Sequence, residues 1–336
     1  MSGAVVCFGE MLLRMSTPAG RRIADAQALE LVVGGAEANV AVALAALGDA
    51  TRIVTLLPDH ALGERALGAI RAAGVDTRFV ARGAGRMGLY FLEPGAGLAP
   101  SRIVYDRAGS AFAETLPAAF DLAGAMDGAA LLHLSGITAA LGPNGLALTR
   151  AAIAAARAAG VPISVDPNYR ATLWDAWDSD PRGALTELIG AADILFAGHR
   201  DMALVLGRDF AGAGEARRAE AAAAALSAFP RLKLVASTAR HPVSAAHHRL
   251  SARVDRRGDA WQSDTIDVTG IIDRIGTGDA FAAGVLHGWL RGGDARAMAE
   301  GGLALAALSH GVHGDFCQFG AEAIAGFSGT AGDVRR

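Results

Sequence analysis

The 336-residue sequence contains a single lysine, Lys233, and only two cysteines, Cys7 and Cys317. Because the one lysine lies in an apparent strand, a phosphate-binding lysine of the P-loop or protein-kinase type is not expected. Any phosphoryl transfer would have to depend on backbone N–H donors, arginine and a divalent metal ion. Two cysteines also exclude a disulfide framework and a multi-cysteine zinc site.

Long apolar runs and an excess of one charge sign are missing as well. The alanine-rich stretches are interrupted well before the roughly 18 apolar residues that a membrane-spanning helix needs. The N-terminus, MSGAVVCFGEM, lacks the basic and apolar regions of a signal peptide. The formal net charge is −3 and there is no basic block, so nucleic-acid or anionic-membrane binding gains no support. We therefore predict a cytoplasmic protein that binds neither nucleic acid nor membranes.

No metal-ligating set is predicted among the nine histidines. His247 and His248 are adjacent, so in a strand their side chains point to opposite faces. His310 and His313 fit one helix face but have no evident third ligand.

What the sequence does contain is a regular alternation of apolar strand patterns and helix patterns, in a chain with 52% hydrophobic residues. Such alternation is typical of an α/β protein, and strands that are apolar on both faces belong to a mostly parallel sheet with helices on both sides. We expect strands at 4–9, 52–57, 130–136, 161–166, 192–198 and 231–237, and helices at 37–47, 61–74, 143–160, 215–228, 278–291 and 294–309.

Two stretches interrupt the alternation with short strand patterns that have no helix between them. We expect the segments of about 11–33 and 77–108 to form a small β-rich lid inserted in a single domain that spans 1–336. Residues 243–262 are typical of a hairpin. Because a lid of this kind exposes strand edges that need cover, we expect a homodimer or a dimer of dimers formed through it.

The segment DRIGTGDAFAAG, residues 273–284, is the most informative part of the sequence. Gly276 and Gly278 precede a predicted helix, so their N–H groups and the positive end of the helix dipole form a site for an anion. Asp279 beside that site fits a base that takes a proton from an attacking hydroxyl group while the N–H donors hold a phosphoryl group. The simpler alternative is a tight turn in which Asp279 only caps the helix. A dinucleotide fingerprint and a P-loop are excluded by the residues that follow the glycines.

Together with a second segment, this turn resembles the ribokinase-like (PfkB) carbohydrate kinases. The second segment is GGAEANVAVALAALG, residues 34–48, which is similar to the N-terminal signature of that family. Within the family, MGLYFLEPG (87–95), VYDRAGSAF (104–112), DPNYRATLW (166–174) and HGVHGDF (310–316) most resemble the 2-keto-3-deoxygluconate kinases. The resemblance implies a three-layer α/β/α fold with a β lid. It also implies ATP and Mg²⁺, and phosphorylation of 2-keto-3-deoxy-D-gluconate to its 6-phosphate in Entner–Doudoroff-type catabolism.

The resemblance also assigns expected roles to individual residues. Asp279 would be the catalytic base, with Gly276, Thr277 and Gly278 as the anion hole. Arg107 and Arg170 would hold the substrate carboxylate with forked N–H donors. The further substrate contacts would come from Gly34, Gly35, Asn39, Tyr90, Tyr105 and Asp315, and the nucleotide contacts from Asn168, Ser237, Thr238, Arg240, Gly276 and Gly278.

Several alternatives remain open on the sequence alone. Tyr90 and Tyr105 fit cross-strand packing, Arg107 and Arg170 fit solvated positions, and Asp315 fits a turn cap. ASTAR, residues 236–240, lacks the Lys-Leu-Gly pattern of the wider family. Asp273 is a candidate for ordering the glycine turn, with or without a monovalent cation as in some relatives.

The alternatives in function are a fructokinase-like or ribokinase-like enzyme, a kinase for the galacto-configured sugar acid, and a non-catalytic sugar-acid sensor. Asp279 and the intact glycine turn argue against the sensor, which needs neither.

Overall fold

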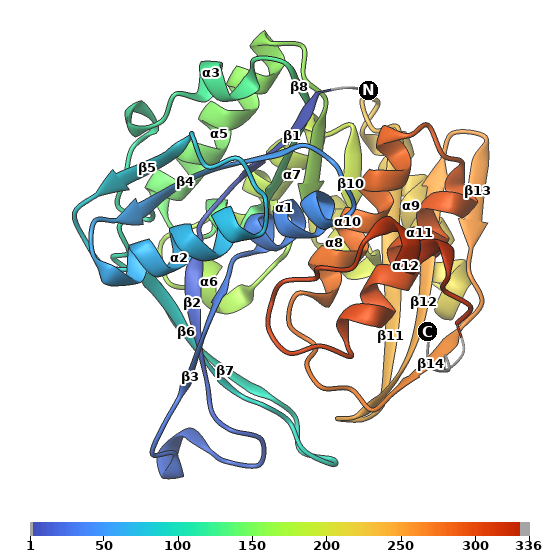
Figure 1. Ribbon diagram of the computed structural model, residues 1–336. Helices are drawn as coiled ribbons and strands as arrows, with labels where there is room; N and C mark the ends of the chain where they lie inside the picture. The colour runs from blue at the N-terminus through green and yellow to red at the C-terminus, as the bar shows by residue number, and fades with distance from the viewer. Residues whose placement is uncertain (1–2, 330–336) are drawn as a thin grey trace.

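A ten-stranded sheet forms the centre of the computed structural model, which describes residues 3–329 (Figure 1). The strand order is β13-β12-β11-β10-β9-β8-β1-β4-β5, and β14 pairs with β12 beyond this path. The pairs from β11 through β10, β9, β8, β1 and β4 to β5 are parallel, whereas β11, β12, β13 and β14 pair antiparallel. The strands are β1 Ala4–Phe8, β4 Thr51–Pro58, β5 Val80–Gly83, β8 Ala129–Ser135, β9 Ile163–Asp166, β10 Ile194–Phe196, β11 Leu234–Ser244, β12 His247–Arg256, β13 Asp259–Gln262 and β14 Ile266–Thr269.

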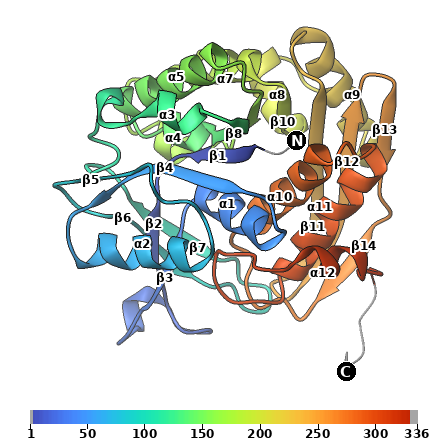
Figure 2. The ribbon, with the colours of Figure 1, turned by 45° about the horizontal axis from the view of Figure 1, so that its top comes forward.

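Helices cover both faces of this sheet, because successive residues of each central strand point to opposite sides. In β1, Val5 and Cys7 belong to one hydrophobic core, and Val6 and Phe8 belong to the other. The first core is closed by α1 Ala36–Ala46, α2 Ala61–Ala72, α10 Thr277–Leu290 and α11 Ala295–Ser309, with α12 Ala321–Ala325 packed on α11 (Figure 2). The second face carries α3 Leu122–Met126, α4 Gly136–Ala139, α5 Pro143–Ala158, α6 Ala171–Trp174, α7 Pro181–Ala191, α8 His199–Leu206 and α9 Gly214–Ala228.

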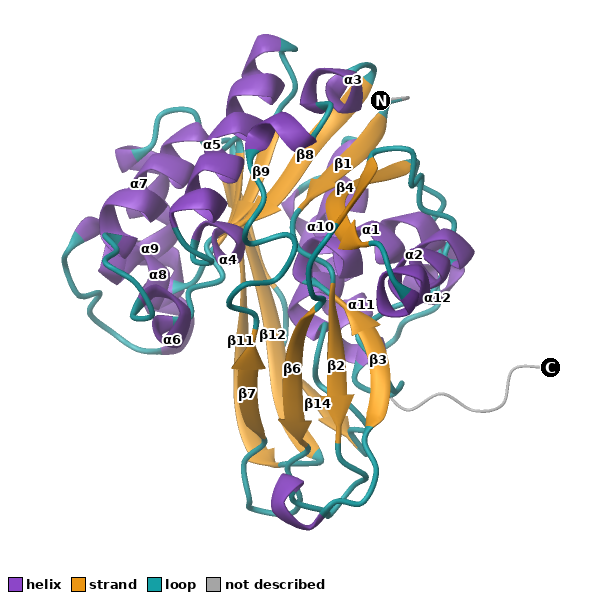
Figure 3. Ribbon diagram, turned by 90° about the vertical axis from the view of Figure 1, so that its left-hand side faces the viewer, coloured by secondary structure: helices purple, strands orange, loops and turns teal. Residues whose placement is uncertain are grey.

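A second, four-stranded sheet projects from the body, with the order β3-β2-β6-β7 (Figure 3). Its strands are β2 Leu12–Ser16, β3 Glu30–Gly34, β6 Gly88–Glu93 and β7 Arg102–Asp106. The two chain segments predicted for the lid supply these strands. Within 77–108, however, β5 pairs with β4 and extends the large sheet instead, because its residues continue the parallel register from Thr55 to Pro58. Two short 3₁₀ turns, Ile23–Asp25 and Pro117–Ala119, complete the elements.

The predicted three-layer α/β/α class with a mostly parallel sheet is confirmed, and so are the six predicted helices within one or two residues at most ends. The strand predicted at 231–237 begins only at Leu234 and continues to Ser244, where it turns into β12. Its second half is largely exposed, which is why an apolar pattern failed to mark it. The helices α7 and α8 and the short helices α3, α4, α6 and α12 were not predicted.

The hairpin predicted within 243–262 corresponds to β12 and β13, which are antiparallel. His247 is partly exposed and bonds to Asp267 at 2.5 Å, whereas His248 is buried, so the two rings lie on opposite faces as predicted. Within residues 3–329, no helix has both the length and the apolar character needed to cross a bilayer.

Candidate active site

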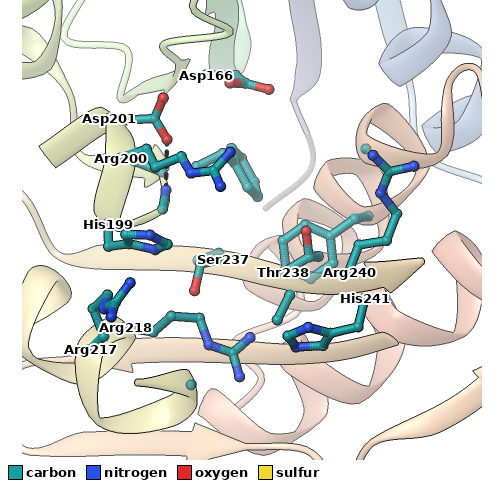
Figure 4. A pocket seen from close by; sticks show the side chains of 18 residues that line it. Asp166, His199, Arg200, Asp201, Arg217, Arg218, Ser237, Thr238, Arg240 and His241 are labelled. Carbon is teal, nitrogen blue, oxygen red and sulfur yellow. Dashed lines mark hydrogen bonds between the residues drawn. The ribbon is translucent and has the colours of Figure 1, made fainter. Parts of the chain in front are cut away.

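Two cavities meet where β9 and β10 end and α10 begins. The first, of about 400 Å³, is lined by residues of the small sheet, α1, the loop after β9 and the start of α10; we call it the Asp279 cavity. The second, of about 550 Å³, lies between β11, α8 and α9; we call it the arginine cavity (Figure 4). Asp166, Asp201 and Gly278 line both, so the two spaces are continuous at these residues.

The glycine turn at the start of α10 has the conformation that its sequence predicts. Gly276 is the N-cap of α10 with φ 77°, in the left-handed region that favours glycine. A Cβ at this position would lie 2.2 Å from the backbone oxygen of Asp315, so a side chain here is excluded. Gly278 has open space around it and lines both cavities, which leaves the N–H groups of the first turn accessible to an anion. Thr277 lines neither cavity, and its hydroxyl group donates to the carbonyl oxygen of Arg274 at 3.0 Å.

Asp279 stands in the first turn of α10 and faces the Asp279 cavity. Burial raises the pKa of its carboxyl group well above the ordinary value, and the nearby Asp166 and Glu37 carboxylates add to the effect. Asn39 opposes this shift, because its Nδ2 donates to Asp279 Oδ2 at 2.7 Å. The aspartate is therefore a proton acceptor of unusually high affinity for a carboxylate, at the wall of a cavity.

Asp315 also lines the Asp279 cavity, where Tyr90 and Arg14 hold it. The Tyr90 hydroxyl group donates to Asp315 Oδ2 at 2.9 Å, and Arg14 Nη1 lies 3.3 Å from Oδ1. Burial raises the pKa of Asp315 to about 6, while Arg14 acts in the opposite direction. Gly34, predicted as a substrate contact, is not in the cavity wall; a Cβ there would lie 2.1 Å from Asp315 Oδ2, so this glycine admits the aspartate.

The two tyrosines predicted to reach the substrate lie opposite each other on neighbouring strands. Tyr90 of β6 pairs with Tyr105 of β7, and their ring centroids are 6.3 Å apart. Both line the Asp279 cavity together with Gly35 and Asn39. Tyr90 and Tyr105 therefore pack against each other across the strands and also line the cavity, so the two interpretations of these residues do not exclude each other.

The two arginines predicted to bind the substrate carboxylate both line the Asp279 cavity, but one is buried and the other is exposed. Arg107 is buried, and its Nε and Nη2 each lie 2.7 Å from Glu10 Oε2. Ser110 donates to the other Glu10 oxygen at 2.5 Å. Arg170 is exposed, and Nη1 donates to the carbonyl oxygen of Tyr169 at 3.0 Å. Arg170 therefore has more N–H donors available to an anion in the cavity than Arg107 has.

The arginine cavity is lined by the β11 residues that are predicted to contact the nucleotide. It is also lined by four arginines, one of which, Arg240, is among those β11 residues. Ser237, Thr238 and Arg240 line it from β11, as Figure 4 shows. Asn168 lines the Asp279 cavity instead. Within residues 3–329, none of the four cavity arginines forms an ion pair with a carboxylate; they are Arg200, Arg217, Arg218 and Arg240. A cavity with this much unpaired positive charge is suited to a polyanion.

Asp166 and Asp201 are the carboxylates at the junction of the cavities. Burial raises the pKa of Asp166 to about 6, and the Asp201 carboxylate adds to this. Burial raises the pKa of Asp201 too, although Gly198 N donates to it at 2.8 Å. Nearby, Asn168 has φ 42° and its buried Oδ1 has no hydrogen-bond partner. Oxygen ligands of this kind fit Mg²⁺ bound jointly with phosphate oxygens, although no complete cluster of three or more ligands occurs within residues 3–329.

Asp273 accepts hydrogen bonds from the backbone of the glycine turn and orders it. Both of its carboxylate oxygens are occupied by hydrogen-bond donors, so neither is free for a monovalent cation. Its Oδ1 accepts from the N–H groups of Arg274 at 2.7 Å and Ile275 at 3.1 Å. Its Oδ2 accepts from Arg14 Nη2 at 2.7 Å and Gly314 N at 3.2 Å. With a guanidinium group already beside the carboxylate, this position does not fit a further cation.

Three buried charged residues at the site were not predicted: Glu10, Arg14 and Glu37. Glu37 accepts from Ser135 N at 3.0 Å and from Ser135 Oγ at 2.5 Å, and a Cβ on Gly9 would collide with it. For Glu10, the sequence did offer a signal: a charged residue that closely follows an apolar strand, as in Phe8-Gly9-Glu10. Neither Arg14 nor Glu37 has a comparable local signal, because their partners lie 98 to 301 residues away in the sequence.

Comparisons with known proteins agree with this geometry. The profile described as pfkB family carbohydrate kinase matches residues 3–316. The chain is 34% identical over 317 residues to 2-dehydro-3-deoxygalactonokinase of Haloferax volcanii, covering 94% of this chain and 93% of that protein. It is 27% identical to 2-dehydro-3-deoxygluconokinase of Thermoproteus tenax, covering 93% and 90%. The crystal structure of 2-dehydro-3-deoxygluconokinase from Thermotoga maritima is similar with a TM-score of 0.90 and 37% identity, over 96% of each chain.

Proposed function

The chain belongs to the pfkB family of carbohydrate kinases, and we propose that it transfers the γ-phosphoryl group of ATP to the 6-hydroxyl group of 2-keto-3-deoxy-D-gluconate. This sugar acid is also called 2-dehydro-3-deoxygluconate. One observation carries the proposal: Asp279, in the first turn of α10, lines the cavity that has an available arginine, and the neighbouring Gly278 lies where this cavity meets the arginine cavity.

The Asp279 cavity supports a carboxylated substrate. Arg170 offers N–H donors on its exposed guanidinium group, and Arg107 lines the same wall. A carboxylate bound by guanidinium donors gains from charge-assisted hydrogen bonds, which are about twice as strong as neutral ones. A neutral hexose would leave this charge unused. Tyr90, Tyr105 and Asn39 supply hydroxyl and amide groups suited to the sugar hydroxyls.

Asp279 would accept the proton of the 6-hydroxyl group as that oxygen attacks the γ-phosphorus, and ADP would leave toward the arginine cavity. A positioned base of this kind contributes about 10²–10⁴ in rate. The N–H groups of Gly276, Thr277 and Gly278 would hold the charge on the transferred group, and each such donor is worth about 10²–10³. Mg²⁺ would be held by Asp166 and Asp201, and it would neutralise phosphate charge.

The arginine cavity supports ATP as the donor. Ser237, Thr238 and Arg240 on β11 would contact the phosphates. The volume of about 550 Å³ lies in the usual range for small-molecule sites.

A second candidate substrate is the galacto-configured sugar acid, because the Haloferax volcanii relative is named for it. The two substrates differ in configuration at one carbon, so the same arginines would serve both. The enzyme would then differ only in which hydroxyl group of the sugar finds a hydrogen-bond partner.

A coupled assay of ADP release tests the proposal. The substrates are 2-keto-3-deoxygluconate, 2-keto-3-deoxygalactonate, fructose, ribose and adenosine. The expected result is the highest kcat/KM for the gluconate. A higher value for the galactonate selects the second candidate. A higher value for any neutral substrate contradicts the sugar-acid assignment, and binding without turnover on all of them indicates a sensor.

A further inference from the structure

Arg14 is a fully buried arginine in the middle of β2, a strand of the small sheet (Figure 3). Its Nη2 donates to Asp273 Oδ2 at 2.7 Å, and its Nη1 lies 3.3 Å from Asp315 Oδ1. Its Nε and Nη1 form no hydrogen bond. The guanidinium group is therefore held in the interior by two carboxylates. Both carboxylates come from segments outside the small sheet, one before α10 and one after α11.

Asp273 connects Arg14 to the glycine turn. Its second oxygen, Oδ1, accepts hydrogen bonds from the backbone N–H groups of Arg274 at 2.7 Å and Ile275 at 3.1 Å. These residues lead directly into the first turn of α10, where the N–H groups proposed to bind the transferred phosphoryl group begin. Within residues 3–329, Arg14 is the only side chain that donates a hydrogen bond to Asp273, since His313 Nδ1 lies 3.7 Å away.

Asp315 connects the same guanidinium group to the wall of the Asp279 cavity. Arg14 is the register partner of Tyr90 on β6, and the Tyr90 hydroxyl group donates to Asp315 Oδ2 at 2.9 Å. The backbone of Asp315 also packs against the glycine turn, because a Cβ on Gly276 would lie 2.2 Å from its oxygen. The small sheet, Asp315 and the glycine turn are thus packed together around Arg14.

Arg14 supplies the positive charge that two neighbouring buried carboxylates need. Burial raises the pKa of Asp315 to about 6 and the Asp273 carboxylate adds to this, whereas Arg14 acts in the opposite direction. Burial lowers the pKa of Arg14, but Asp315 and Asp273 outweigh this effect and the net shift is upward. Removing one partner from a buried ion pair leaves an uncompensated charge, which is strongly unfavourable. The backbone that Asp273 holds would therefore lose its fixed position without Arg14.

We infer that Arg14 is a positioning residue for phosphoryl transfer, which acts through Asp273 to hold the N–H groups of the glycine turn in place. This inference rests on the proposed function. Arg14 lines neither the Asp279 cavity nor the arginine cavity, so it contacts no ligand there. Donors aimed at charge that develops during the reaction act mainly on the transition state. A displaced turn should therefore lower kcat more than it raises KM.

The variant Arg14→Lys tests this with the charge retained. A lysine ammonium group lacks the planar fork of donors with which a guanidinium group meets two carboxylates. We expect kcat to fall about 10- to 100-fold, since a displacement of about 1 Å at a site can reduce the rate by about 10²-fold. The KM values for ATP and the sugar acid should stay within about fivefold, because Tyr90 still holds Asp315.

Asp273→Asn removes the other partner and should lower kcat to a similar extent. The double variant Arg14→Lys/Asp273→Asn should be no slower than the slower single variant, because the two residues act as one unit. The matched control is Arg253→Lys, which alters another largely buried pair, Arg253 with Asp255 at 2.7 Å, on β12. This control should keep kcat within about threefold of the wild type.

Steady-state kinetics and thermal unfolding are measured for every variant. A lower melting temperature with unchanged kcat in Arg14→Lys means that the role is structural and overturns the inference. Higher KM values with unchanged kcat overturn it as well. If Arg14→Lys does not fold, Asp273→Asn decides: wild-type kcat in that variant excludes a role of Arg14 through Asp273.

Hydrogen exchange of the peptide 273–280, measured without substrates, is an independent readout of the turn. Exchange should be faster in Arg14→Lys and unchanged in Arg253→Lys, and unchanged exchange in Arg14→Lys contradicts the inference. A wild-type protein that phosphorylates none of the tested sugars ends the proposed function, and this inference with it. An active wild type whose kcat survives in Arg14→Lys refutes only the role of Arg14.

Discussion

Asn39 of α1 donates a hydrogen bond of 2.7 Å to Asp279 of α10, across 240 residues of sequence. The bond joins the two glycine-rich segments that carry the family resemblance, since Gly35 and Gly276 are the N-caps of the two helices. It fixes the orientation of the Asp279 carboxylate and stabilises its charged form. The two segments therefore build one site rather than two.

Replacing Asp279, the proposed base, should strongly lower turnover without abolishing binding. We expect Asp279→Asn to lower kcat by about 10²–10⁴, because the proton acceptor is lost while the side chain keeps its shape. Calorimetry with the sugar acid should show binding within a few fold of the wild type. Since burial raises the pKa of Asp279, the wild-type kcat/KM should fall with decreasing pH at a higher pH than for an ordinary aspartate. Turnover of Asp279→Asn within a few fold of the wild type would exclude this residue as the base.

The stability of the fold should decrease as pH rises through the acid range, because of Glu37. Burial raises its pKa to about 7, from an ordinary value of 4.5. Between these values the folded protein holds a proton that the unfolded chain has released, so stability falls as pH rises from 4.5 to 7. The expected loss from this group is about 3 kcal/mol.

Urea unfolding of the wild type and of Glu37→Gln at several pH values checks this. The variant should show a flatter profile between pH 4.5 and 7. Glu300→Gln, an exposed glutamate paired with Arg296, should leave the profile unchanged. A parallel decline in the wild type and in Glu37→Gln would count against the assignment.

Arg107 and Arg170, the two arginines proposed to hold the substrate carboxylate, should differ in the effect of their replacement on stability and on KM. Arg107→Met leaves the buried Glu10 without its partner, and breaking a buried pair costs about 3–5 kcal/mol of stability. Arg170→Met removes an exposed side chain and should raise the KM for the sugar acid with little change in stability. Unfolding curves and kinetics on both variants separate these effects. The double variant Glu10→Gln/Arg107→Met should recover part of the stability, and equal stability of the two single variants would refute the prediction.

Activity should not depend on a particular monovalent cation. Asp273 already accepts four N–H donors, one of them from Arg14, so it has no oxygen left for a potassium ion. The rate at constant ionic strength should agree within about twofold in sodium, potassium and choline chloride. Strong activation by potassium alone would show that the Arg14–Asp273 pair is replaced during turnover.

The small sheet should mediate a dimer. Its edge strand β7 exposes Ile103 at 37% and Val104 at 55%, and an exposed apolar edge strand is prone to pair with another chain. Light scattering at micromolar concentration should give at least twice the monomer mass. Val104→Lys should shift the mass toward that of the monomer, while Val243→Lys, an exposed valine of β11, should not. A monomeric wild-type protein would end this proposal.

The sequence by itself predicted the central parallel strands of the large sheet, six of the helices that cover its two faces and the position of the glycine turn. These features follow from local signals: apolar strands such as 4–9, helix ends at glycine, and Gly276 where φ is positive. The family resemblance added Asp279, Asn39, Tyr90, Tyr105 and Arg170 as one site, and all five line the same cavity.

Only the tertiary structure decided how the charges are paired. Sequence order contains no distance between Glu10 and Arg107, so a predicted substrate ligand turned out to have a buried carboxylate partner. Gly34 was predicted to contact the sugar, but the fold uses it to admit Asp315. Nothing in the sequence marked Arg218, because its hydrogen bonds to Ser251 and Gln262 form only once α9 is packed against β12 and β13. Backbone preferences act over a few residues, whereas electrostatic pairing depends on which distant side chains the fold brings within hydrogen-bond reach.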